Sequence, residues 1–189
     1  MKVGFFGGSF DPIHFGHLAL AIAILEKGLV DRILFCPARC SPFKTGTPPK
    51  ADDSLRAKMI EAAIQDIPQF ELYREELSRP APSYTIDAIR HLIQQGKQSI
   101  RLILSSEAAS HLHEWKEEEE LLRLAPPLIG QTGEISGPFK RRLEPYLVEI
   151  PRFDISSTEI RARIKKSLYI GHLVPKSVLE IIVAHRLYS

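Results

Sequence analysis

The chain has 189 residues, and its 25 Lys and Arg against 23 Asp and Glu leave a formal net charge of only +2. That balance argues against a strongly basic nucleic-acid-binding protein, and no stretch reaches the roughly 20 apolar residues of a membrane span. The hydrophobic fraction of 44% and the charged fraction of 25% are ordinary for globular proteins, so we expect one domain over residues 1–189. Cys36 and Cys40 lack the second pair of a zinc site, and the N-terminal apolar run is interrupted too early for a secretory signal. These features predict a cytoplasmic protein with free thiols, and with neither nucleic acid nor a membrane as partner.

Apolar runs that suit buried strands alternate with helical segments along the chain. The runs predict strands at 3–6, 32–36, 70–72, 100–104, 127–129 and 146–150. Helices are predicted at 18–27, at 55–64 with Asp52 or Asp53 as N-cap, and at 84–95 with Ser83 as N-cap. Strands alternating with helices predict a Rossmann-like α/β fold, in which right-handed crossovers build a parallel sheet. From about residue 155 the chain is predicted to turn helical.

Residues 7–17, with the sequence GGSFDPIHFGH, join the first strand to the first helix. Two adjacent glycines let backbone N–H groups approach a ligand, and the helix start adds free N–H groups with a partial positive charge. His14 and His17 are three residues apart across that helix start, so we expect both imidazoles to point at one bound anion. The stretch matches neither the P-loop nor the dinucleotide fingerprint. It predicts a phosphate site of another kind.

A second helix start lies in residues 155–161, with the sequence ISSTEIR. Ser156 and Glu159 have the spacing of a capping box, which explains both residues structurally. Ser157, Thr158 and Arg161 remain as two hydroxyls and a guanidinium at the positive end of a helix. A phosphate chain between this helix start and the one at His17 would be held from both sides.

The stretch 7–17 closely resembles the His-x-Gly-His signature of the nucleotidylyltransferase superfamily, in the version typical of bacterial nicotinate-nucleotide adenylyltransferases. Residues 155–161 are similar to that superfamily's motif for the ATP β- and γ-phosphates, and the resemblance runs from Lys2 to Tyr188. It implies a Rossmann-like nucleotidylyltransferase fold that transfers AMP from ATP to nicotinate mononucleotide. The ATP-binding residues that it implies are Gly7, Gly8, Ser9, Phe10, His14, His17, Ser156, Ser157, Thr158 and Arg161. The family commonly has Gly-x-Asp after the fourth strand, where this chain has Ser105-Ser106-Glu107, so Glu107 is expected near the adenosine ribose.

Further resemblances imply where the acceptor binds, with Ser9 and Phe10 contributing. Lys44 falls in a Pro-Phe-Lys stretch that resembles the family's Pro-Pro-His-Lys/Arg, whose basic residue meets substrate phosphate. Residues 82–85 resemble the family's Pro-Ser-Tyr-Thr, which implies that Tyr84 and Thr85 hold the pyridine nucleotide. Trp115, the only tryptophan, falls where an aromatic side chain stacks on the pyridine ring in these enzymes.

The acceptor's phosphate monoester is already anionic at neutral pH, because its second pKa is about 6, so no general base is needed. Catalysis then requires alignment of two anions and neutralisation of the developing charge. We expect His14 and His17 around the α-phosphate, Arg161 with its neighbouring hydroxyls on the departing pyrophosphate, and Lys44 between donor and acceptor phosphates. Mg²⁺ is expected to enter on the ATP phosphates, because no acidic cluster marks a protein-held site.

Two other hypotheses are kept. The acceptor could be another phosphorylated molecule, such as nicotinamide mononucleotide or phosphopantetheine. Alternatively, the altered segment 105–107 belongs to a regulatory nucleotide-binding protein that has lost turnover. The choice between acid and amide substrate stays open on the sequence alone, as does assembly into a homo-oligomer.

Overall fold

The computed structural model describes residues 1–40, 48–131, 133–151 and 153–189. Over these residues six parallel strands form one sheet in the order β3-β2-β1-β4-β5-β6. The strands are β1 (Lys2–Gly8), β2 (Arg32–Pro37), β3 (Phe70–Leu72), β4 (Ser99–Ser105), β5 (Pro127–Gly130) and β6 (Leu147–Val148). The predicted parallel α/β sheet is therefore confirmed. The last strand is shorter than the predicted 146–150, because Glu144–Tyr146 forms a 3₁₀ turn that precedes it.

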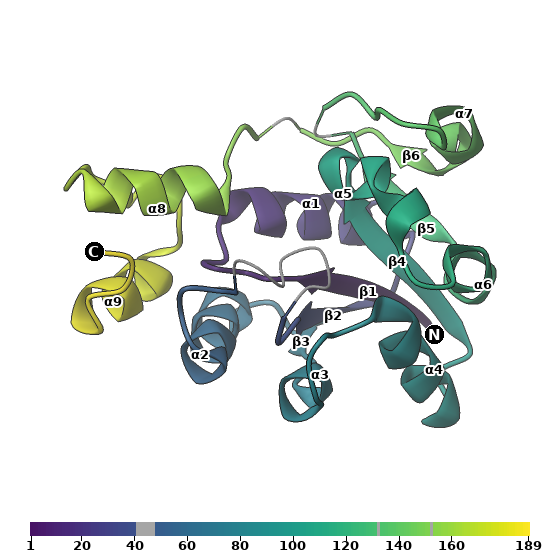
Figure 1. Ribbon diagram of the computed structural model, residues 1–189, viewed down its shortest axis with the longest axis horizontal. Helices are drawn as coiled ribbons and strands as arrows, with labels where there is room; N and C mark the ends of the chain where they lie inside the picture. Colours follow the sequence, from purple (N-terminus) through teal and green to yellow (C-terminus); the bar gives the residue numbers. More distant parts are fainter. Residues whose placement is uncertain (41–47, 132, 152) are drawn as a thin grey trace.

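Helices cover both faces of this sheet and extend beyond one end of it. They are α1 (Phe15–Glu26), α2 (Asp53–Ile64), α3 (Glu75–Ser78), α4 (Thr85–Gln94), α5 (Ser106–Ser110), α6 (Glu118–Leu124), α7 (Lys140–Leu143), α8 (Ser157–Lys165) and α9 (Lys176–Ala184). Figure 1 shows α8 and α9 at the side of the molecule toward which β1 runs, with the C-terminus beside them and the N-terminus at the other side. No helix in the described ranges is long and apolar enough to cross a membrane.

The strand residues alternate between two cores, as side chains on successive positions of a strand must. Ile33 and Phe35 of β2 belong to the core that α1, α2 and α9 cover. Leu34 and Cys36 of the same strand belong to the core on the opposite face, which α4 and α6 cover. Because both faces are covered, the strands read as continuous apolar runs in the sequence, which is why they were predictable.

The helix caps test the predicted helix starts. Asp52 caps α2 as expected, with its carboxylate accepting the Leu55 N–H at 2.8 Å. The predicted Ser83 cap of α4 is wrong, because that helix begins at Thr85 with Tyr84 as its N-cap. Ser83 instead accepts the N–H of Arg39 at 3.0 Å. Its hydroxyl therefore fastens the chain before α4 to the segment that follows β2.

The strand order places the reversal of the sheet between β1 and β4. From β1 the chain first builds outward through β2 and β3, and then returns to the other side of β1 with β4. In open parallel sheets, ligands bind in the crevice at the carboxyl ends of the strands that flank such a reversal. Gly7 and Gly8 end β1, and Ser105 ends β4. The fold therefore directs attention to the space between these residues.

Candidate active site

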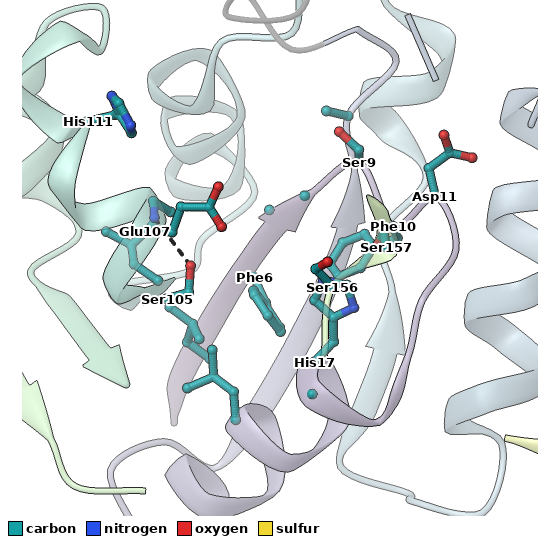
Figure 2. A pocket seen from close by; sticks show the side chains of 18 of the residues that line it. Phe6, Ser9, Phe10, Asp11, His17, Ser105, Glu107, His111, Ser156 and Ser157 are labelled. Carbon is teal, nitrogen blue, oxygen red and sulfur yellow. Dashed lines mark hydrogen bonds between the residues drawn. The ribbon is translucent and has the colours of Figure 1, made fainter. Parts of the chain in front are cut away.

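A cavity of about 1330 Å³ opens at this point of the sheet. It brings together every predicted site residue that lies in the described part of the chain, whereas Lys44 lies outside the described residues. Figure 2 shows two walls, with Glu107 and His111 on one side and Ser9, Ser156 and Ser157 on the other. We call residues 7–17 with the start of α8 the loop wall, and α5 with the residues up to Trp115 the α5 wall.

The two histidines of the loop wall lie face to face. The ring centroids of His14 and His17 are 3.7 Å apart with an interplanar angle of 26°. The backbone N–H of His14 donates to Nδ1 of His17 at 3.3 Å, so a neutral His17 ring carries its proton on Nε2, where it can donate to a ligand. A Cβ at Gly16 would lie 3.1 Å from the His14 ring. Glycine between the histidines therefore leaves His14 the room for this stacked position.

His14 is buried, with 5% of its surface exposed. Desolvation by this burial lowers the pKa of its imidazole to about 4, so the ring is neutral at pH 7. Its Nδ1 is buried and has no hydrogen-bond partner among the described residues. At pH 7, His14 is thus a neutral polar group whose Nδ1 is available for a hydrogen bond with a ligand, rather than a fixed positive charge.

Phe10 turns the loop between the glycines and the histidines. Its φ of +46° lies in the left-handed region, which a residue with a bulky side chain rarely adopts. The ring is 2% exposed and packs edge-on against Phe6, with centroids 5.4 Å apart. Phe10 was predicted to bind ligand. The structure gives its side chain a packing role, because the ring anchors the turn in the core below the cavity.

Two buried charged residues, Asp11 and Arg56, hold the loop wall in place, and neither was predicted as a site residue. Asp11 is 4% exposed and accepts the N–H groups of Lys50 at 2.8 Å and Ala51 at 3.1 Å. Arg56 of α2 is fully buried and donates to the carbonyl of Ser9 at 2.6 Å. Each side chain thus joins the loop to the chain around the start of α2.

The start of α8 contacts the loop directly. Ser156 caps the helix as expected, accepting the Glu159 N–H at 3.1 Å. The Ser157 hydroxyl donates to the carbonyl of Pro12 at 2.9 Å, and Arg161 donates to the carbonyl of Asp11 at 2.7 Å. Ser157 and Arg161, which the sequence analysis assigned only to ligand binding, therefore also bind the loop. A guanidinium has five N–H donors, so Arg161 keeps donors for an anion.

The α5 wall faces the loop wall across the cavity. Ser105 caps α5 by accepting the Ala108 N–H at 3.2 Å, and Glu107 lies exposed in the first turn of that helix. Tyr84 and Thr85 line the cavity at the start of α4, and Lys116 lies over the Tyr84 ring at 4.5 Å from its centroid. Trp115 lines the cavity while packing against the core below it. Trp115 therefore combines a packing contact with a position at the cavity, where the resemblance predicts an aromatic side chain.

A buried carboxyl also lines the cavity and was not predicted. Glu76 of α3 is 4% exposed and accepts a hydrogen bond from Arg79 at 3.0 Å. Desolvation raises the pKa of Glu76, although Arg79 opposes that shift. The signal in the sequence was weak, because an acid three residues before an arginine is a common surface pair.

Comparison with known proteins agrees with this geometry. The model of the cytidylyltransferase-like family matches residues 5–163. A protein of Methylacidiphilum infernorum named probable nicotinate-nucleotide adenylyltransferase is 37% identical over 191 residues, covering 99% of this chain and 92% of its own length. The protein of the same name from Bacillus pumilus is 34% identical over 189 residues, covering 100% of this chain and 98% of its own length.

Two solved structures share the fold. The Plasmodium falciparum nicotinic acid mononucleotide adenylyltransferase complexed with NaAD superposes with a TM-score of 0.79 at 22% identity, covering 99% of this chain and 97% of that one. The same enzyme complexed with APC gives a TM-score of 0.76 at 20% identity, covering 99% and 96%. The fold and the cavity define a nucleotidyltransferase of the cytidylyltransferase-like type. More closely, the full-length matches show that the chain belongs to the nicotinate-nucleotide adenylyltransferase family.

Proposed function

We propose that this chain transfers the adenylyl group of ATP to nicotinate mononucleotide, forming nicotinate adenine dinucleotide and pyrophosphate in NAD biosynthesis. The observation that carries the proposal is the contact between two helix starts in one cavity. The loop before α1 and the first turn of α8 are joined through Ser157 and Arg161, so two sets of helix N-terminal N–H groups serve the same space. The volume of about 1330 Å³ exceeds that of a typical single-ligand pocket, which suits a donor and an acceptor side by side.

The reaction forms one P–O bond and breaks another. An anionic oxygen of the acceptor 5′-phosphate attacks the α-phosphorus of ATP, and the bond from that phosphorus to the oxygen bridging to the β-phosphate breaks. The electron pair leaves with pyrophosphate, and no proton needs to be removed from the nucleophile. The task of the protein is to align the two anions and to stabilise the charge on the departing group.

The loop wall supplies the groups for this task. Nε2–H of His17 and the neutral ring of His14 serve as hydrogen-bond donors to the α-phosphate. Because the α-phosphate oxygens gain charge in the transition state, these hydrogen bonds are stronger there than in the ground state and therefore raise the rate. Arg161, which donates a hydrogen bond to the Thr158 hydroxyl at 3.2 Å, meets the pyrophosphate together with that hydroxyl. Glu107 on the α5 wall accepts from the ribose, while Tyr84, Thr85 and Trp115 hold the pyridine nucleotide.

Mg²⁺ accompanies ATP as part of the substrate. Among the described residues no group of three or more His, Cys, Asp and Glu could hold a metal ion. Asp11, the buried carboxylate of the loop, already accepts hydrogen bonds from Lys50, Ala51 and Tyr188. The described residues do not form a protein-held cage, so we assign the ion to phosphate oxygens and water, where it would neutralise phosphate charge.

The test is pyrophosphate release from ATP and Mg²⁺ with three acceptors: nicotinate mononucleotide, nicotinamide mononucleotide and phosphopantetheine. We expect turnover that strongly favours the nicotinate substrate, and no release without an acceptor. Preference for another acceptor would keep the chemistry and overturn the substrate. Measurable ATP binding without turnover on any of the three would favour a regulatory nucleotide-binding protein instead.

A further inference from the structure

The last turn of the chain returns to the loop at the other end of the sequence. Tyr188, the penultimate residue, is 9% exposed, and its hydroxyl donates to Oδ1 of Asp11 at 2.8 Å. Its φ of +68° lies in the left-handed region, which costs energy for any residue with a Cβ. The C-terminal segment thus adopts an unfavourable backbone conformation at the residue that delivers the phenol to Asp11.

Asp11 is the point at which three parts of the fold meet. Its carboxylate accepts from Tyr188, and from the two backbone N–H groups of Lys50 and Ala51. Its own carbonyl accepts from Arg161 of α8. Burial and the Asp11 charge raise the pKa of the Tyr188 phenol, so the phenol stays protonated and donates at working pH. Figure 2 shows the Asp11 side chain directed away from the α5 wall, so this junction supports the loop at the side of the cavity far from that wall.

The neighbouring carbonyls of the loop are held as well. Ser9 and Pro12 offer theirs to Arg56 and Ser157 at 2.6 and 2.9 Å. A carbonyl oxygen carries partial negative charge and would repel a phosphate, so donors that take these oxygens leave the loop better suited to an anion. The loop is thus shaped in part by a group, Arg56, that does not line the cavity.

We propose that Tyr188 is a positioning residue for adenylyl transfer, which acts through the Asp11 carboxylate on His14 and His17 further along the same loop. The inference rests on the proposed function. Removal of the phenol hydroxyl leaves Asp11 with its two backbone donors but without the C-terminal one, so the turn between Ser9 and His14 loses a fixed point. A reacting group displaced by a fraction of an ångström loses rate more than ground-state affinity.

The decisive variant is Tyr188→Phe, which keeps the buried ring and removes only the hydroxyl. We expect kcat for pyrophosphate release to fall about 10-fold, while KM for both substrates stays within about 2-fold of the wild type. A hydroxyl that served stability alone would lower the melting temperature and leave kcat per folded enzyme unchanged. The ratio of the kcat effect to the KM effect, measured well below the melting temperature, separates the two roles.

Ser177→Ala is the matched control. Ser177 of α9 donates to the carbonyl of Ala62 in α2 at 2.8 Å, so this variant also removes one hydrogen bond between the C-terminal segment and the rest of the chain. It touches neither Asp11 nor the loop, and we expect a comparable loss of melting temperature with unchanged kcat. An equal fall of kcat in both variants, or an unchanged kcat in Tyr188→Phe, would overturn the inference while the proposed function stands.

A second measurement separates failure of the inference from failure of the proposed function. Ring NMR signals of His14 and His17 in the ligand-free protein report the loop directly, whatever the enzyme catalyses. We expect both to shift in Tyr188→Phe and to stay in place in Ser177→Ala. Unchanged signals in Tyr188→Phe would overturn the inference. A wild-type protein that releases no pyrophosphate with any acceptor would overturn the proposed function. The ring signals would still show whether Tyr188 positions His14 and His17.

Discussion

The two walls of the cavity are built in different ways. The loop wall is held by side chains that reach it from distant elements, including Arg56 of α2, Arg161 of α8 and Tyr188 near the C-terminus. The α5 wall combines short-range contacts, such as the Ser105 cap and the hydrogen bond between His111 and Glu114 at 3.0 Å, with hydrogen bonds from Ser106 and Ser110 to the nearby segment 130–136. The loop wall is thus tied to elements from distant parts of the sequence, whereas the α5 wall is tied to itself and to the segment around the end of β5.

This difference follows the demands of the proposed chemistry. In-line displacement requires that the positions and orientations of the reacting atoms, and of the groups around the α-phosphate, vary very little. Ribose and pyridine contacts tolerate more adjustment, because they bind the ground state and the transition state alike. The buried charges that hold the loop wall are costly to desolvate, so they are better explained by the geometry that they impose than by net stability. The comparison leads us to expect rate effects from the loop wall and affinity effects from the α5 wall.

The largest expected effect comes from His17. In His17→Ala, kcat should fall by about 100- to 1000-fold, the usual cost of one donor to a developing oxyanion, while KM for ATP changes by less than about 3-fold. The physical reason is that Nε2–H meets the α-phosphate most strongly when its oxygens gain charge. Steady-state pyrophosphate release over a range of ATP concentrations measures both constants.

His185→Ala provides the comparison for this experiment, because His185 follows α9 on the surface and does not line the cavity. It should behave as the wild type. Unchanged turnover in His17→Ala would remove this histidine from the mechanism. A large rise in KM with normal kcat would instead give it a role in ground-state binding.

Burial of His14 gives the loop wall a pH dependence of stability. Its pKa of about 4 in the folded protein lies below the value of about 6.5 in an unfolded chain. Above pH 6.5 the imidazole is neutral in both states and contributes no pH dependence. Between 6.5 and 4 the unfolded state binds the extra proton, so the free energy of unfolding falls as the pH falls. From pH 7 to pH 5 the loss should be about 2 kcal/mol.

Urea denaturation at the two pH values measures this loss, with His14→Asn as reference, because asparagine suits the N-cap position that His14 occupies. The variant should lose about 2 kcal/mol less than the wild type over this interval. Equal pH dependence in the two proteins would mean that His14 is not desolvated in the folded state.

Sequence patterns sufficed for the fold because its elements are encoded locally. Residues 32–36 form an uninterrupted apolar run, and a sheet covered on both faces requires such runs. Asp52 caps α2 through a residue three positions away. The Ser83 prediction failed for the opposite reason. Ser83 accepts a hydrogen bond from the N–H of Arg39, 44 residues earlier, and no local sequence pattern predicts that contact.

The same distinction applies to the site. The motif resemblance and the helix-start chemistry predicted many of the residues that line the cavity, but not Asp11 or Glu76. Asp11 was not predicted, since it meets Tyr188 across 177 positions of sequence and an Asp-Pro pair is ordinary in a turn. Arg56 did carry a signal: it precedes Met59 and Ile60 at helical spacing, which places it on the buried face of α2. A charge on an apolar face requires a partner, and here the partners are the Asp53 carboxylate at 2.5 Å and the Ser9 carbonyl of the loop.

The smallest expected effect tests the α5 wall. Glu107→Gln should raise KM for ATP about 5-fold and leave kcat within about 2-fold, because one neutral acceptor replaces a carboxylate on a ribose hydroxyl. Glu107 is exposed in the first turn of a short helix, so its substitution should leave the melting temperature unchanged. Glu119→Gln on the exposed side of α6 should change neither constant, which separates a contact from a general charge effect. A fall in kcat with constant KM for Glu107→Gln would break the contrast between the walls, because the α5 wall would then act on the transition state as the loop wall does.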